Sequence, residues 1–304
     1  MMRSRITARH TTPISLLVLL VAAGLLAFGV LGAQTIPAHY ARLAPSVKPT
    51  ATVVPTGPSG HLGPLINIPQ TWNNCGPATV GEVLAYWGII RNQAQVQAVL
   101  RADGDPLGMA PYGVPAYMRS LGVEAVLGVN GSQRLVKALI SNGFPVIVDQ
   151  YIGLDDPVGH YRPIQAYDDR RQVYVSSDPY LGQGHEIRYG DFDALWQSTN
   201  RQFIVIFPRT RQPLLNAVLA AAGWNITAAS RQDLAFQQGL LKGTIVDHTL
   251  DGSPKSYYLA MAWDQLQLRQ YNASRQSVQE ALHLGASQIA ADWITNELSL
   301  AMRP

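Results

Sequence analysis

Cys75 is the residue whose type and position most directly indicate chemistry in this sequence. It is the single cysteine among 304 residues, so it cannot form an intramolecular disulfide. It stands in the run Asn74-Cys75-Gly76-Pro77, directly before a segment with helical periodicity. The thiolate is the reactive form of cysteine, and the positive end of a helix lowers the pKa of a thiol toward neutrality. We therefore expect Cys75 to be a nucleophile with a lowered pKa.

His160 and Asp178 are predicted to supply the base that such a nucleophile needs. Residues 161–167 and 172–177 have the composition of strands, and the polar residues between them are typical of a turn. A hairpin folded about Asp169 places His160 opposite Asp178 within one residue of register. Directly opposed side chains have Cβ atoms about 4.5–5.5 Å apart, so the carboxylate can orient the imidazole.

Gln70 is the predicted oxyanion donor, because an amide upstream of the nucleophile can act together with the backbone N–H of Cys75. Such a donor contributes about 100- to 1,000-fold in rate.

Metal and nucleotide chemistries find less support in the sequence. His185 has no second histidine at metal-binding spacing, and one cysteine excludes cysteine-rich zinc sites. The glycines of Gly182-Gln183-Gly184 do not follow a strand-to-helix phosphate pattern. We expect no metal and no cofactor.

With these residues in place, the chain resembles the papain-like cysteine peptidases of family thirty-nine, the bacteriocin-processing type, in its stand-alone branch. The resemblance covers about residues 64–208. By position it implies Cys75 as nucleophile, His160 as general base, Asp178 as orienter and Gln70 as oxyanion donor. It also implies cleavage of peptides after small residues. The segments that carry it are Ile68-Pro69-Gln70, Asn74-Cys75-Gly76-Pro77-Ala78, Asn142-Gly143-Phe144-Pro145-Val146, Gly159-His160-Tyr161-Arg162-Pro163, Ala166-Tyr167-Asp168, Asp178-Pro179-Tyr180 and Leu195-Trp196.

The N-terminal region predicts a membrane segment. Residues 14–33 carry no charge, and twenty helical residues span roughly 30 Å, the thickness of a bilayer core. Arg3, Arg5 and Arg9 precede them, so residues 1–13 are expected in the cytoplasm and the rest of the chain outside. A cleaved signal peptide is the alternative, although its apolar part is usually about 7–15 residues long. In that case the protein is secreted.

The remaining chain divides into three predicted parts. Residues 34–60 are rich in Pro and Thr and are expected to form an extended linker. Residues 61–208 have helical patterns first and strands second, which predicts an α+β, papain-like core of helices packed on an antiparallel sheet. Residues 209–304 predict an all-α domain. Within it, residues 257–284 resemble a tetratricopeptide-like helix pair, although an irregular helical domain fits equally well.

Charge excludes one class of partner. The formal net charge is +3 and the basic residues are scattered, so nucleic acid is not an expected ligand. The expected partners are a peptide or protein substrate, the membrane through the N-terminal helix, and a protein at the C-terminal helices. Our prediction is a membrane-anchored, extracytoplasmic cysteine peptidase working through a thioester. Two alternatives stay open: an inactive papain-like module that binds a peptide or surface ligand, and another amide-acyl transfer on the same core.

Overall fold

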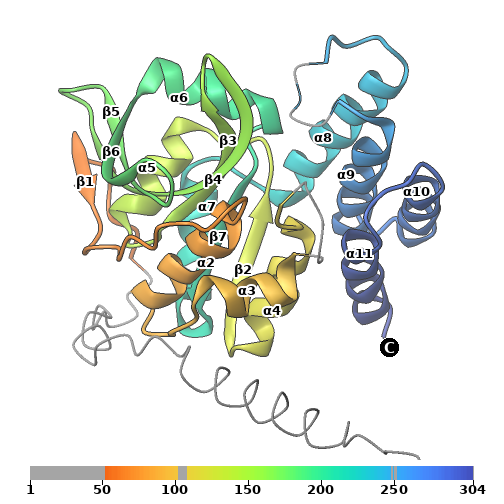
Figure 1. Cartoon of the computed structure of the whole chain (residues 1–304), viewed down its shortest axis with the longest axis horizontal. Coiled ribbons are helices and arrows are strands. Elements are labelled where there is room, and N and C mark those ends of the chain that lie inside the picture. The colour runs from red at the N-terminus through yellow and green to blue at the C-terminus, as the bar shows by residue number, and fades with distance from the viewer. Residues whose placement is uncertain (1–51, 102–107, 248, 250–251, 304) are drawn as a thin grey trace, which may run out of the picture. The chain divides into compact units, whose positions relative to one another are not determined.

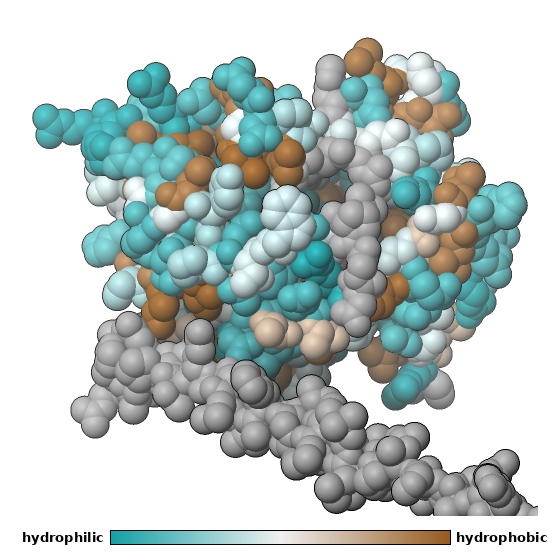
Figure 2. Space-filling model, viewed as in Figure 1, coloured by the Kyte–Doolittle hydropathy of each residue, from teal (hydrophilic) through white to brown (hydrophobic). Residues whose placement is uncertain are grey.

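The computed structural model describes residues 52–101, 108–247, 249 and 252–303, and Figure 1 shows the whole chain. The predicted N-terminal parts 1–13 and 14–33, and most of the predicted linker, lie outside these residues. Among the described helices, none combines the length and the apolarity that a membrane span requires. On the face shown in Figure 2, the coloured surface is mixed, with apolar residues in small groups among polar ones.

One antiparallel sheet is the framework of the described structure. Its main path runs β2-β7-β3-β4-β5-β6, and β1 pairs with β4 beside that path. Runs of apolar and β-branched residues, such as FIVIFP in β7, favour strands buried on both faces. The predicted α+β class with an antiparallel sheet is confirmed. The strands are β1 (Ser59–His61), β2 (Val123–Gly128), β3 (Val146–Gly153), β4 (Asp156–Asp168), β5 (Val173–Asp178), β6 (Gly182–Arg188) and β7 (Phe203–Pro208).

Helices cover this sheet and continue to the C-terminus. The helices of residues 75–211 are α2 (Cys75–Tyr86), α3 (Gln93–Leu100), η2 (Pro111–Gly113), α4 (Val114–Ser120), α5 (Gln133–Ser141), α6 (Tyr189–Trp196), η3 (Gln197–Thr199) and η4 (Arg209–Arg211). Those that follow are α7 (Gln212–Ala221), α8 (Ile226–Leu241), α9 (Pro254–Gln267), α10 (Tyr271–His283) and α11 (Gln288–Ala301). The predicted all-helical C-terminal part is confirmed.

Helix α2 is buried along its whole length against β4. Pro77 lies in its first turn, where a missing N–H costs nothing, and Gly88 follows its end with φ of +80°. The hydroxyl of Thr79 donates to the carbonyl of Tyr161 in β4 at 3.0 Å. This bond links the helix that begins at Cys75 to the strand that contains His160.

The segment before the domain is attached to the sheet, which corrects the linker prediction at its C-terminal end. Val54 donates its N–H to the Asn142 side chain at 2.7 Å, and its carbonyl accepts from the same amide at 3.0 Å. Ser59–His61 then pairs with Ala166–Asp168 as strand β1. The composition predicted an extended linker up to residue 60, whereas the Asn142 side chain holds Val54 and the edge of β4 holds residues 59–61.

The C-terminal helices share their core with the rest of the molecule. Helix α7 packs Leu215 and Val218 among the residues of α5 and the sheet. Helices α9 to α11 belong to a second cluster that also contains residues of α2, α4 and β7. They stand beside the sheet-and-helix body in Figure 1. The domain boundary at 208/209 stays a prediction, although both apolar clusters contain residues from before and after it. The α9–α10 pair packs through small residues, with Ala262 and Ala281 fully buried, and its tetratricopeptide-like character stays a prediction.

Candidate active site

Cys75 is the first residue of α2, at the positive end of the helix. The chain enters the helix through Asn73, whose φ of +52° is a left-handed conformation that asparagine tolerates. The side chain of Gln93 holds this entry loop: its oxygen accepts from the N–H of Thr71 at 2.8 Å and from the Asn74 amide at 2.9 Å. The turn that presents the thiol is therefore fixed by side-chain hydrogen bonds, and sequence reasoning missed Gln93.

The thiol itself is 8% exposed and faces a cavity. Burial raises the pKa of the Cys75 thiol, and the backbone N–H of Tyr161, which points at the sulfur, offsets this only in part. The negative charge of Asp149 raises the pKa further. The expectation of a lowered thiol pKa is therefore wrong, because loss of hydration outweighs the helix end.

His160 and Asp178 meet in a closed region of the sheet. His160 Nε2 lies 2.9 Å from Asp178 Oδ1, and the side chains are 1% and 0% exposed. The register differs from the prediction. The hairpin turns between Asp168 and its partner Val173 rather than about Asp169, and a bulge before Ile164, which pairs with Ser176, moves the register back by one residue, so Asp178 falls opposite residue 162 rather than 160. Residues two apart on a strand share a face, and the imidazole therefore still reaches the carboxylate diagonally.

Arg162 is the residue that stands across from Asp178, and sequence reasoning did not single it out. Its Nε lies 3.2 Å from Asp178 Oδ2, and both side chains are fully buried. Its Nη2 also donates to the carbonyl of Ile152 at 3.0 Å. The available signal was its position two residues after His160, which puts both side chains on one face of the strand.

The pKa values in this cluster fix which groups are charged at neutral pH. Burial alone would raise the pKa of Asp178, but the hydrogen bond from His160 and the charges of His160 and Arg162 lower it to about 2. Burial lowers the pKa of His160, and its bond to Asp178 opposes that shift. The resting site therefore has an ionised Asp178, a neutral imidazole and a neutral thiol at Cys75. With Nε2 engaged by the carboxylate, Nδ1 is the ring nitrogen available to accept a proton.

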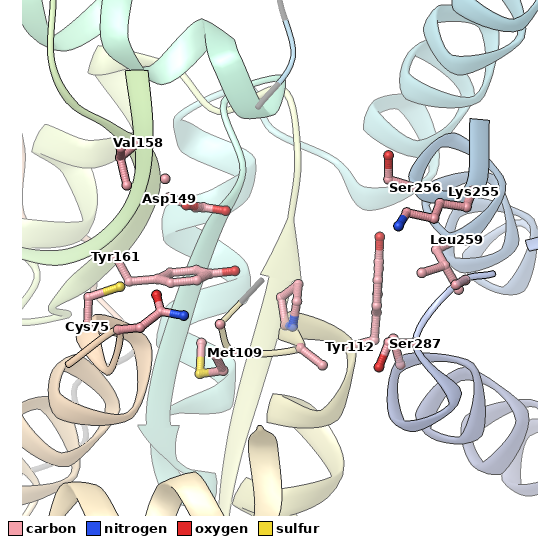
Figure 3. A pocket seen from close by; sticks show the side chains of 17 residues that line it. Cys75, Met109, Tyr112, Asp149, Val158, Tyr161, Lys255, Ser256, Leu259 and Ser287 are labelled. Carbon is pink, nitrogen blue, oxygen red and sulfur yellow. The ribbon is translucent and has the colours of Figure 1, made fainter. Parts of the chain in front are cut away.

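Cys75 is connected to the strand of His160 through the backbone of β4. The N–H that points at the Cys75 sulfur belongs to Tyr161, the neighbour of His160. The structure describes no hydrogen bond between the sulfur and the His160 ring. Cys75, Tyr161 and Asp149 line the cavity of Figure 3, whereas His160 and Asp178 are not among its lining residues.

Gln70 is placed beside the Asp178 turn. Its backbone N–H donates to the carbonyl of Pro179 at 2.9 Å, and its side-chain oxygen is buried without a partner among the described residues. Gln70 does not line the cavity, although Asn73 does. The structure thus joins Gln70 to the Asp178 end of the site and leaves its oxyanion role a prediction.

A buried carboxyl group, Glu82 of α2, links these parts and was also missed. Its Oε1 accepts from the N–H of Ile68 at 2.7 Å and from the amide of Asn67 at 3.4 Å. Asn67 in turn donates to the carbonyl of Asp178 at 2.9 Å. Burial raises the pKa of Glu82 to about 9, so the group is a neutral acid at pH 7. One acid inside an otherwise apolar helix was the signal in the sequence.

Asp149 is the acidic residue on the cavity wall next to Cys75. It stands opposite Tyr161 in the β3–β4 pairing and accepts a hydrogen bond from that side chain. Burial raises the pKa of Asp149 to about 7, against the opposing effect of the bond from Tyr161. A carboxyl group half ionised at neutral pH therefore faces the thiol.

The model of the Peptidase_C39 like family matches residues 64–204. Among solved structures, the peptidase domain of Streptococcus ComA, a bi-functional ABC transporter involved in a quorum sensing pathway, matches with 19% identity and a TM-score of 0.39. That match covers 47% of this chain and 97% of the ComA domain. No curated protein matches the chain. Residues 64–204 are therefore similar to the Peptidase_C39 like family, which supports a papain-like cysteine peptidase core.

Proposed function

We propose that this protein is a cysteine peptidase that hydrolyses peptide bonds with Cys75 as nucleophile, His160 as general base and Asp178 as the residue that orients the base. The observation that carries the proposal is the buried 2.9 Å bond between His160 and Asp178, next to the residue whose N–H points at the sulfur. A carboxylate held on one imidazole nitrogen leaves the other free to take the thiol proton.

The reaction begins with a neutral pair. As the Cys75 sulfur attacks the peptide carbonyl, its proton passes to Nδ1 of His160, and Asp178 stabilises the imidazolium that forms. The Gln70 amide and the Cys75 N–H stabilise the oxyanion in this proposal. The imidazolium then protonates the leaving amine, which departs and leaves a thioester. His160 next takes a proton from water, and the resulting hydroxide attacks the thioester carbonyl. The C–S bond breaks, the acid leaves, and the imidazolium returns its proton to the Cys75 sulfur.

Labelling with a thiol-directed peptide probe tests this function directly. Because Cys75 is the only cysteine, every labelled molecule reports on it. We expect labelling and peptide hydrolysis in the wild-type protein, no labelling and no hydrolysis in Cys75→Ala, and slow labelling in His160→Ala. Circular dichroism provides the folding control. Labelling of Cys75→Ala at the wild-type level would overturn the proposal.

A second candidate, an inactive binding module, is favoured by one observation: the thiol has a raised pKa and no described bond to the imidazole. Another acyl transfer on the same core is the third. Incubation of the protein with peptide mixtures and an amine acceptor separates them. Hydrolysed peptides indicate the peptidase, and peptides joined to the amine indicate acyl transfer. Peptides that stay bound to the protein without chemical change indicate the binding module.

The location of the domain is part of the proposal. The uncharged residues 14–33 behind Arg3, Arg5 and Arg9 support an anchor with the catalytic domain outside the cytoplasm. Fractionation after carbonate extraction, followed by protease treatment of intact cells, tests it. We expect the protein in the membrane pellet and degradation by external protease. Recovery in the medium indicates cleavage of the segment, and protection in intact cells would contradict the orientation.

A further inference from the structure

The cavity at Cys75 has two walls from distant parts of the chain. One wall contains Cys75, Asp149 and Tyr161, and the other comes from the first turns of α9 and α11, with Lys255 and Ser287. The volume is about 350 Å³, within the range of about 300–1,000 Å³ for ligand sites. On the basis of the proposed function, we propose that the C-terminal helices complete the substrate cleft and that Lys255 binds a carboxylate of the peptide.

The second wall is built into the fold. A Cβ on Gly113 of η2 would lie 2.6 Å from the Trp293 ring of α11, so these elements approach more closely than a larger residue allows. Tyr112 lies with its ring centre 5.6 Å from that of Trp263 in α9. Helices α9 and α11 therefore pack directly on the segment that follows the cavity's Met109 and keep the wall in place.

Polar contacts hold the same junction at two further points. Arg119 of α4 forms an ion pair with Glu297 of α11. Asn200, which follows η3, donates to the buried carboxyl of Asp233 in α8. A partner-binding appendage needs no such attachment, whereas a cleft wall must keep a fixed distance from the nucleophile.

The charge of the cavity is divided between its walls. Asp149 on the Cys75 side and Lys255 on the helix side are the charged side chains among the described lining residues. Figure 3 shows the Lys255 ammonium directed into the cavity. Lys255 is half-buried, and no described carboxylate lies within ion-pair distance of it. The first turns of α9 and α11 add the positive ends of two helices to the same wall.

The rest of the lining is mostly apolar and includes Met109, Leu259 and Ala290. This arrangement fits a peptide that packs an apolar portion between the walls and directs a carboxylate toward Lys255. That carboxylate can come from an acidic side chain or from the free C-terminus of the peptide. The two sources share one chemistry, and the test separates them.

Binding to the full chain carrying Cys75→Ala tests the proposal without turnover. Two peptide sets are measured by fluorescence anisotropy: one exchanges Glu for Gln at each position, and the other compares a free C-terminus with an amide. We expect one acidic position, or the free terminus, to tighten binding about two- to fivefold, as for a partly exposed ion pair. Equal binding of every acidic and neutral peptide would overturn the proposal.

Charge reversal identifies the residue. In the Cys75→Ala background, Lys255→Glu should remove the preference for the acid and favour a Lys-containing peptide at the same position, and Lys255→Gln should only remove it. Lys242→Glu, on an exposed residue at the end of α8 outside the cavity, should change nothing. A preference for the acid that survives Lys255→Glu would overturn the assignment.

Turnover measured in parallel keeps the two proposals apart. Peptide hydrolysis by the protein with Cys75 intact tests the function, and Lys255-dependent binding tests the inference. Binding that depends on Lys255 without hydrolysis supports the inference and contradicts the peptidase. Hydrolysis with no dependence of KM or binding on Lys255 supports the peptidase and overturns the inference.

Discussion

The two halves of the candidate active site are organised in opposite ways. The base half, His160 with Asp178 and Arg162, is closed to solvent, and each charged group faces a partner. The nucleophile half, Cys75 with Asp149, faces a cavity, and both groups have raised pKa values. The fold has fixed the ion pair in advance and has left the thiol in its neutral form.

This difference assigns distinct tasks to the two halves. A prearranged carboxylate–imidazole pair needs no reorganisation when the imidazolium forms. The thiol must lose its proton during attack, and the charge of Asp149 influences its pKa. A substrate that fills the cavity and changes the surroundings of Asp149 therefore changes the pKa of the Cys75 thiol. Mutations in the base half should therefore change folding and turnover, whereas substitution of Asp149 in the nucleophile half should mainly change the titration of the Cys75 thiol.

The largest effect is expected from Arg162→Met. The substitution leaves Asp178 as a buried charge without its cation, and we expect a loss of about 3–5 kcal/mol in the free energy of unfolding. Denaturant titration measures it. The double variant Arg162→Met/Asp178→Asn removes the buried charge as well and should recover part of the loss. A single variant as stable as the wild type would show that the base half does not depend on this pairing.

Asp178→Asn should reduce kcat by at least about 100-fold with little change in KM, because an amide does not stabilise the imidazolium that forms during attack. Steady-state hydrolysis of a peptide substrate measures it, with circular dichroism to verify folding. Asp156→Asn, at the exposed start of β4, is the matched control and should retain wild-type turnover. A kcat for Asp178→Asn within about twofold of the wild type would mean that the imidazole needs no carboxylate.

Glu82→Gln tests the buried link between the halves through stability. The folded-state pKa of about 9 exceeds the unfolded value of about 4.3, so the folded protein retains a proton that the unfolded chain releases. Stability from this group is complete below about pH 4.3 and falls by about 1.4 kcal/mol per pH unit up to about pH 9.

Gln keeps the acceptor for the Ile68 N–H but does not titrate. Unfolding free energies at pH 5 and pH 8 should therefore differ less in Glu82→Gln than in the wild type, and the variant should be the more stable at pH 8. Other titrating groups are common to both proteins and cancel in the comparison. Parallel pH profiles would indicate that Glu82 is not the buried neutral acid described here.

The smallest effect is expected at the thiol. The alkylation rate of Cys75 as a function of pH should show a pKa above the ordinary thiol value, because burial raises it. Asp149→Asn should lower that pKa by removing a nearby negative charge. Asp156→Asn again serves as the control and should leave the profile unchanged. A thiol pKa below the ordinary value would reverse the contrast between the two halves.

Much of this site could be predicted because its parts follow local rules. The helix entry at Cys75 is readable from Pro77 and from apolar spacing, and the hairpin between His160 and Asp178 from turn residues. The register was wrong by two residues because the hairpin turns after Asp168, with Asp168 paired to Val173, and the polar residues 168–172 do not mark the centre of the turn. Side chains alternate between the two faces of a strand, so a register shift of two residues leaves His160 and Asp178 on the same face and within reach of each other.

Other features depended on contacts that local patterns do not encode. Gln93 and Asn67 look like ordinary surface amides in sequence, and their roles follow from which loop lies beside them. The raised pKa of Cys75 depends on burial by β4, which a helix-end argument ignores. Lys255 lies 180 residues from Cys75 in the chain and meets the same cavity only through packing of α9.

The pairing of β1 with β4 has a mechanical consequence. His160 lies on the strand that residues 59–61 extend along, and the Val54–Asn142 bonds clamp the chain just before it. A pull on the N-terminal side of the described chain therefore loads the Val54–Asn142 bonds first and the antiparallel β1–β4 hydrogen bonds next. It reaches the strand that holds the imidazole before it reaches the helix that begins at Cys75.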